Sequence, residues 1–278
     1  MSPIPGITGF PPLGTGRLID ALTDAGLVTA PSLALCQDFA DRDCTNSATP
    51  QVFTDLSGAG YTFWNGSSNV GSTFDMQWNG TPGALTRNEY MKNTSANGGQ
   101  GSQQQLRGGI NNPAWVEGGH KNNAAFAVGG WFWLEATGQG TIMATSEIFW
   151  TNDPGWAFTT MGASGLGFYA RTGGSQGLIA SVGTAVSRNA WHYLAMSIDE
   201  ATGSIWFQVD GTVTLVGPGA FTLSDASASA GRLCIGSNIA GHWSLLLNSR
   251  CGAAFGWSGT LAPAKMPTVF NATRSRFV

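Results

Sequence analysis

From residue 31 onward, short apolar runs alternate with turn residues. Each run is bounded by Gly, Pro or Asn, and aromatic and β-branched residues fill most of them, which is typical of half-buried strands. No repeat of roughly 20–50 residues is visible, which disfavours propellers and solenoids. The pattern therefore predicts an all-β sandwich or barrel with strands at Ser32–Leu35, Phe74–Trp78, Phe126–Leu134, Thr141–Thr145, Trp156–Thr160, Gly167–Arg171, Ile179–Val182, Trp191–Ile198, Ser204–Val209, Arg232–Gly236 and Gly252–Trp257.

The start of the chain has a different pattern. The first sixteen residues are rich in Pro and Gly and predict an extended arm. Residues 17–27 then place Leu18, Ile19, Leu22 and Ala25 on one face of a short amphipathic helix, with Gly26 at the C-terminal cap. We therefore divide the chain into an arm with a helix at residues 1–30 and a sandwich at 31–278.

The apolar residues of this segment allow two interpretations. Either the helix docks on its own domain, or the whole segment is an assembly arm that contacts a neighbouring molecule. In the second case the contact residues are Ile4, Phe10, Leu18, Ile19, Leu22 and Leu27. Further along, residues 92–109 are polar and predict a long loop, or a segment that a partner orders.

The low content of charged residues is the most unusual property of the sequence. Charged residues make up 10% of the chain, against about 25% in an average domain, and the formal net charge is −3. Such a surface suits a protein packed in an assembly, with self-association, and equally suits a surface that binds neutral sugars. Nucleic acid is excluded as a partner because Arg274 and Arg276 are the nearest approach to a basic cluster.

The start of the chain lacks the features of a secretory signal, and no apolar run approaches the roughly 18 residues of a membrane span. We therefore expect no membrane partner and synthesis in a cytoplasm. There the four cysteines are reduced by default, although Cys36 with Cys44, and Cys234 with Cys251, are each placed to bridge neighbouring strands or a loop.

Three segments carry a resemblance to a known family. They are Phe126-Ala-Val-Gly-Gly-Trp-Phe-Trp133, then Trp191-His-Tyr-Leu-Ala-Met-Ser-Ile-Asp199, and Thr202-Gly-Ser-Ile-Trp-Phe-Gln-Val-Asp-Gly211. In order and spacing they resemble the laminin-G-like or concanavalin A-like lectin domain. The opening Asp55-Leu-Ser-Gly58 and the closing segment 259–271 resemble versions of this domain found in bacteriophage virion structural proteins.

This resemblance implies a two-sheet antiparallel jelly-roll sandwich that closes with a strand and a short helix. Large aromatic side chains such as Trp131, Trp133 and Trp191 are expected in its core. Asp210-Gly211 predicts a hairpin turn, since Gly adopts a positive φ at little cost. His192 is interpreted as a strand histidine with a satisfied hydrogen bond.

The sequence gives little support for an enzymatic function. Sandwich glycosidases of this kind carry Glu-x-Asp-x-Glu, and the closest run here is Asp41-Arg-Asp43. Gly173-Gly-Ser-Gln-Gly177 matches a serine-nucleophile motif formally, but it lies between two strands and predicts a hairpin turn. His120, His192 and His242 stand far apart, so no metal residues and no cofactor are predicted. For calcium, Asn152, Asp153 or Asp55 are the available oxygen ligands, but single carboxylates give no specificity.

Two function classes remain. The first is a non-enzymatic virion structural protein, capsid-decorating or fibre-like, which is made in a host cytoplasm, attached through its N-terminal arm to other capsid or tail proteins, and located in the virion. The alternative is a carbohydrate-binding adhesin that recognises host-surface glycans. Aromatic rings stack on sugars while Asn and Asp bind hydroxyls, so the candidate ligand-binding residues are Trp150, Asn152, Asp153, Trp156, His242 and Trp243.

Overall fold

The computed structural model places most of the chain. It describes residues 16–45, 47, 49–66, 75–94, 104–109, 112–135, 138–146, 154–162, 165–172, 175–217, 219, 221–223, 231–238 and 244–278.

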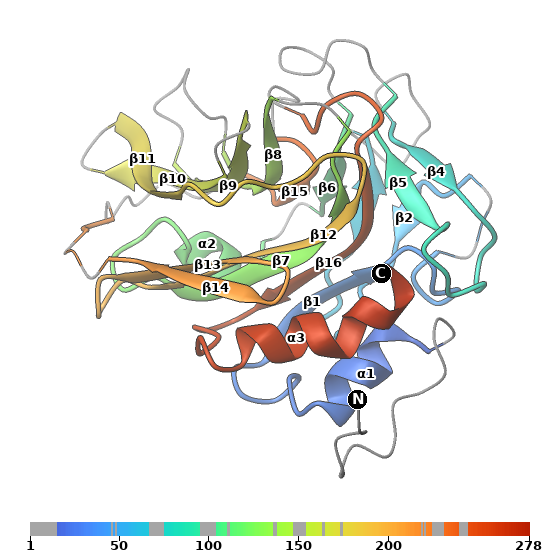
Figure 1. Ribbon diagram of the computed structural model, residues 1–278, viewed down its shortest axis with the longest axis horizontal. Helices are drawn as coiled ribbons and strands as arrows, with labels where there is room; N and C mark the ends of the chain where they lie inside the picture. Colours follow the sequence, from blue (N-terminus) through green and yellow to red (C-terminus); the bar gives the residue numbers. More distant parts are fainter. Residues whose placement is uncertain are drawn as a thin grey trace, which may run out of the picture.

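Two antiparallel sheets of eight strands each form a sandwich (Figure 1). The prediction of an all-β, two-sheet antiparallel sandwich is therefore confirmed. One sheet, called here the middle sheet, has the order β14-β13-β12-β7-β16-β5-β4, and β1 also pairs with β16. Its strands are β1 (Leu33–Asp38), β4 (Gln77–Asn79), β5 (Tyr90–Lys92), β7 (Ala125–Trp133), β12 (Trp191–Asp199), β13 (Ser204–Val209), β14 (Thr212–Val216) and β16 (Arg250–Trp257).

The second sheet, called the outer sheet, has the order β11-β10-β9-β8-β15-β6-β3-β2. Four of its eight strands have only two or three residues, and the strands at one end of the order come from the first half of the chain. They are β2 (Val52–Phe53), β3 (Phe63–Asn65), β6 (Leu106–Gly108), β8 (Gln139–Ala144), β9 (Trp156–Met161), β10 (Leu166–Thr172), β11 (Ser175–Val182) and β15 (Cys234–Ile235).

The middle sheet is apolar on both faces, which distinguishes it from an ordinary sandwich sheet. Along β7, Phe126, Val128 and Phe132 point into the core between the sheets, whereas Ala127 and Trp131 point to the opposite face. Successive strand side chains alternate between faces, so a run that is buried throughout must be covered on both sides. Trp131 and Trp191 are buried as predicted, but they lie in this second core and not between the sheets.

The second core is covered by helices α1 (Leu18–Asp24) and α3 (Met266–Thr273) and by the C-terminal segment, so the molecule has three layers (Figure 1). Trp131 is its centre. The indole ring stacks on Phe277 with ring centroids 4.7 Å apart, and its N–H donates to Thr273 Oγ1 at 2.8 Å. The short helix implied by the closing segment is α3.

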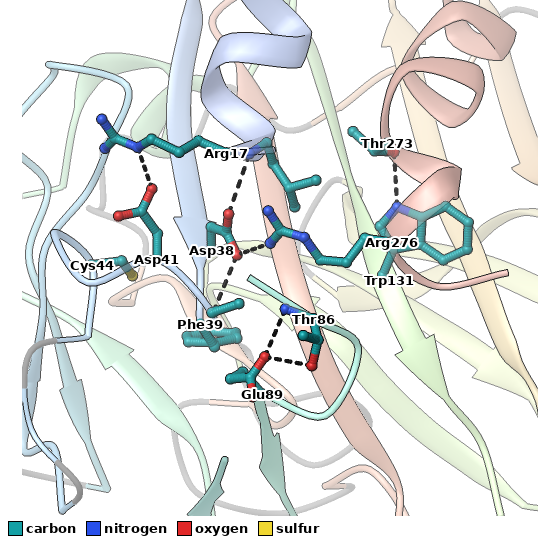
Figure 2. A network of polar contacts seen from close by, with 12 residues as sticks. Arg17, Asp38, Phe39, Asp41, Cys44, Thr86, Glu89, Trp131, Thr273 and Arg276 are labelled. Atoms are coloured by element: carbon teal, nitrogen blue, oxygen red, sulfur yellow. Dashed lines mark hydrogen bonds and ion pairs between the residues drawn. The ribbon is translucent and has the colours of Figure 1, made fainter. Parts of the chain in front are cut away.

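A buried ion pair fixes this layer to the sheet (Figure 2). Arg276, in the 3-10 turn Arg274–Arg276 after α3, donates to Asp38 Oδ1 at the end of β1 and to the backbone carbonyl of Gly16. Asp38 Oδ2 also accepts a hydrogen bond from Leu18 N at the start of α1, 3.3 Å away. Arg17 forms a second, more exposed pair with Asp41 at 2.5 Å. One carboxylate thus joins three segments that are distant in sequence.

Helix α1 packs against its own domain. Leu18, Leu22 and Leu27 are buried in the second core, Ile19 packs at its edge, and Trp257 Nε1 donates to Leu27 O at 2.8 Å. In the described part of the segment, docking on the chain's own sandwich is therefore the interpretation that the contacts support. Ile4 and Phe10 lie outside the described residues.

Several local predictions need correction. The β13–β14 hairpin forms at Asp210-Gly211 as expected, but the positive φ belongs to Asp210 at +54°. The segment 92–109 is not wholly loop, because β6 lies within it, and helix α2 (Ala114–Gly118) follows closely. Phe74–Trp78 is replaced by the shorter β4, and Phe74 lies outside the described residues. All four cysteines are buried free thiols.

Removing residues 1–28 should destabilise the sandwich. Three buried leucines leave the second core, and each contributes about 1.5–3 kcal/mol, so the free energy of unfolding should fall by on the order of 5 kcal/mol. Thermal denaturation followed by circular dichroism should show a melting temperature lower by about 10 °C or more. Removal of residues 1–15 alone, which keeps α1, is the control. An unchanged melting temperature without residues 1–28 would contradict the assignment of α1 to the core.

Replacing Arg276 by Met should leave the buried Asp38 carboxylate without its ion-pair partner. Breaking a buried pair from one side costs about 3–5 kcal/mol, whereas Arg274→Met on the exposed side of the same turn should cost less than about 1 kcal/mol. The loss should be measured by urea denaturation at pH 7 and pH 4.

The loss should be smaller at pH 4. Burial already raises the pKa of Asp38, opposed by Arg276, so loss of the guanidinium raises that pKa further. A carboxyl whose pKa is higher in the folded than in the unfolded state loses stability as the pH rises through the folded value and regains it on acidification. Equal losses at both pH values would contradict this account of the pair.

Candidate functional site

Most of the predicted ligand-binding residues fall outside the described part of the chain. These are Trp150, Asn152, Asp153, His242 and Trp243. Trp156 is described, and the prediction for it needs correction. Its side chain is 0% exposed, its ring packs 4.8 Å from that of Phe126, and its indole N–H donates to Val116 O. Trp156 is therefore a core residue, because no face of its ring is open to a ligand.

Asp55, the remaining candidate calcium ligand, uses its carboxylate within the fold. Its Oδ1 accepts from the backbone N–H groups of Cys36 and Ser57, and its Oδ2 accepts from Ser57 Oγ at 2.6 Å. The Asp-Leu-Ser-Gly opening thus ties a turn to β1. Across the described residues there is no group of three or more His, Cys, Asp and Glu side chains that could hold a metal ion.

Ser187, His192 and Asp210 form a chain of hydrogen bonds. His192 Nε2 lies 2.8 Å from Ser187 Oγ, and His192 Nδ1 lies 2.9 Å from Asp210 Oδ2. Asp210 Oδ1 also accepts from Tyr193 N, so the carboxylate holds the β13–β14 turn against β12. The expectation of a histidine with satisfied hydrogen bonds is confirmed.

The same order of groups occurs in serine hydrolases, where the serine is the nucleophile. Acyl transfer needs more than this relay, however. It requires N–H donors aimed at the developing oxyanion and a pocket for the acyl group. Ser187 lies exposed in the segment before β12, and Asp210 is 37% exposed. The hydrogen bonds of His192 with Ser187 and Asp210 join the segment before β12 to the β13–β14 turn.

Arg250 is held between two aromatic rings on the face of the middle sheet that carries the second core. Its guanidinium carbon lies 4.7 Å from the ring centre of Trp133 and 4.8 Å from that of Tyr90. Trp191 contacts both rings and continues into the second core through Phe277. Arg250 is therefore covered by its aromatic neighbours, and this group extends the second core to the surface.

A different arrangement lies on the face of the outer sheet that points away from the middle sheet. Strand register places Val52, Trp64, Arg107 and Cys234 in one row across β2, β3, β6 and β15. Their neighbours along the chain, such as Phe53 and Phe63, fill the core between the sheets, so this row faces outward. Trp64 and Arg107 are half-buried, and Val52 is 44% exposed.

Arg232 completes this group, which we call the Arg–Trp cluster (Trp64, Arg107 and Arg232). The guanidinium carbon of Arg232 lies 5.4 Å from the centre of the Trp64 ring. Burial lowers the pKa of Arg107, and the positive charge of Arg232 lowers it further. The cluster therefore combines an aromatic surface with two neighbouring positive charges.

Sequence reasoning missed the Arg–Trp cluster. Its three residues come from segments far apart in the chain, and each arginine stands alone in its segment. The available signal is local: Phe63-Trp64 and Leu106-Arg107 alternate a buried apolar residue with an outward one, as a strand does. Which strands would be neighbours was not predicted.

No helix among the described residues is long and apolar enough to cross a membrane. A scan against protein-family models and a search of curated proteins found no match.

Solved structures match over most of the chain. The binding domain of botulinum neurotoxin DC in complex with SialylT has a TM-score of 0.56 and 11% identity, and the match covers 87% of this chain and 51% of that one. A structure of botulinum neurotoxin type C, whose cell entry depends on interaction with two ganglioside molecules, has a TM-score of 0.57 and 12% identity, and the match covers 89% of this chain and 53% of that one. The botulinum serotype C1 binding domain has a TM-score of 0.57, 12% identity, and coverage of 87% and 52%.

The chain thus spans about half the length of these matched chains. At 11–12% identity the likeness concerns the fold alone. The shared fold is a two-sheet antiparallel β-sandwich.

Proposed function

We propose that this protein is a non-enzymatic, lectin-like module that binds carbohydrate on the outward face of the outer sheet. The observation that carries the proposal is the Arg–Trp cluster. It sets an aromatic ring beside two arginines, Arg107 and Arg232, that form no ion pair with any described residue. Sugars are recognised by apolar ring contacts together with directed polar groups.

The fold supports this proposal. One of the matched solved structures is a complex with SialylT, and another concerns a neurotoxin whose cell entry depends on interaction with two ganglioside molecules. A sandwich with few charges and many Gly, Ser, Thr and Asn residues also suits contact with a neutral or weakly charged glycan surface. Recognition of host-surface glycans is then the biological setting that we propose.

Trp64→Ala should weaken glycan binding. Saccharides bound by the wild-type protein on a glycan array should be measured by isothermal titration calorimetry, and the variant should bind at least about tenfold more weakly, or about 1.4 kcal/mol. Trp206→Ala is the matched control, because Trp206 is also half-buried but lies on the middle sheet. Equal affinity for wild-type protein and Trp64→Ala would place sugar binding elsewhere. An array without any bound saccharide would overturn the proposed function.

Binding without catalysis can be tested at Ser187. If the Ser187–His192–Asp210 relay has only a structural role, wild-type protein and Ser187→Ala should hydrolyse p-nitrophenyl acetate at the same low rate. Neither should be labelled by a fluorophosphonate probe at this residue. Because Ser187 is exposed, its replacement leaves the core intact. A burst of nitrophenol that Ser187→Ala abolishes would show a serine nucleophile and contradict the non-enzymatic assignment.

Attachment to a virion remains a second candidate, as a capsid-decorating or fibre-like module. Its support is the low charge, 10% of residues, together with the resemblance of the opening and closing segments. Because α1 packs on its own domain, residues 1–15 are the part of the proposed arm left to contact other virion proteins. Light scattering on the full chain and on a chain starting at Gly16 tests this. Self-association that is lost with residues 1–15 would support an assembly arm, and identical monomers would remove its basis.

A further inference from the structure

The two arginines of the Arg–Trp cluster differ from those arginines of the fold that form an ion pair. Arg276 and Arg17 are each paired with an aspartate. Arg107 and Arg232, by contrast, form no ion pair among the described residues, although they are close enough for one charge to lower the pKa of the other. Neighbouring like charges that are partly withdrawn from water raise the free energy of the folded state unless an anion joins them.

Among the described residues, no carboxylate forms an ion pair with Arg107 or Arg232. Cys234 lies beside Arg107 in the strand register, but burial raises the pKa of its thiol to about 12. At pH 7 the thiol is therefore neutral despite the two arginines. Glu117, whose charge acts on Tyr61 as that of Arg232 does, accepts a hydrogen bond from Asn112 at 2.8 Å.

Two polar atoms of the same region also lack partners. Arg107 Nε is buried without a hydrogen-bond acceptor, and Gln105 Oε1 is buried without a donor. Gln105 is 2% exposed and stands two residues before Arg107, so strand alternation places both on the outward side. Other described residues also hold such atoms, among them Arg250 Nε and Arg276 Nε, so these two atoms count only together with the unpaired charges of the cluster.

We propose that the Arg–Trp cluster is a subsite for an acidic sugar, a pyranose ring that carries a carboxylate. Arg107 and Arg232 bind the carboxylate, and the ring lies against Trp64 and the exposed Val52. This inference rests on the proposed function and deepens it, because it names the class of glycan.

Geometry and charge favour a carboxylated sugar over other anions. A guanidinium presents parallel N–H donors that match the two oxygens of a carboxylate. The aromatic ring and Val52 add an apolar surface that an inorganic ion would not use, and a sugar would. Nucleic acid would need a longer track of basic residues than two arginines in a chain with a net charge of −3.

The test compares 3′-sialyllactose with lactose, since the two differ by the acidic sugar. Titration calorimetry should show that the wild-type protein binds 3′-sialyllactose at least about tenfold more tightly than lactose. Arg107→Gln and Arg232→Gln should each remove most of that preference. Arg87→Gln, at an exposed arginine elsewhere on the surface, should leave the preference unchanged. Inorganic phosphate should bind much more weakly than 3′-sialyllactose.

The outcomes separate this inference from the proposed function. Lactose bound as tightly as 3′-sialyllactose would overturn the acidic-sugar inference and leave glycan binding standing. Phosphate bound as tightly as 3′-sialyllactose would reduce the cluster to a simple anion site and overturn it too. A preference that survives both arginine variants would place the acidic sugar elsewhere. If no saccharide binds at all, both the proposed function and this inference fail.

Discussion

The middle sheet must be covered on both faces, and most of the remaining architecture follows from this constraint. Its long strands β7, β12 and β16 are buried along nearly their whole length. The outer sheet covers one face, and α1, α3 and the C-terminal turn cover the other. Trp131 alone links β7 to Thr273, Phe270 and Phe277. Without these helices, a layer of large aromatic side chains would face water.

In the helical layer the buried ion pair fixes the position of the covering segments, whereas apolar packing supplies the stability. A buried ion pair gains little net free energy over an apolar pair, but it admits few alternative geometries. The Asp38 carboxylate accepts from Arg276 and from the first turn of α1, so it fixes both covering segments at one end of β1. The arginines of the Arg–Trp cluster lack such a partner among the described residues, as does Arg250, which its aromatic neighbours cover.

The sequence predicts those parts of the fold whose signals are local. Strand alternation and the turn at Asp199–Gly203 identify the β12–β13 hairpin, and the apolar face of residues 17–27 identifies α1. Strand β6 was missed because its three residues lie in a polar stretch and are held by neighbours distant in the chain. Trp156 shows the same limit for sites. Composition suggests a stacking platform near an Asn-Asp turn, but burial depends on the packing of Phe126 and Val116, which local pattern does not contain.

The two ends of the described chain lie together. Gly16 O accepts a hydrogen bond from Arg276, two residues before the C-terminal Val278, on the helical side of the middle sheet (Figure 1). The Arg–Trp cluster lies on the far side of the sandwich. A surface, resin or carrier protein joined through the C-terminal residue Val278 would therefore hold the molecule by its helical layer and turn the outer sheet toward the solution. Immobilisation for binding measurements, or fusion into a multivalent display, can use this residue without shielding the cluster.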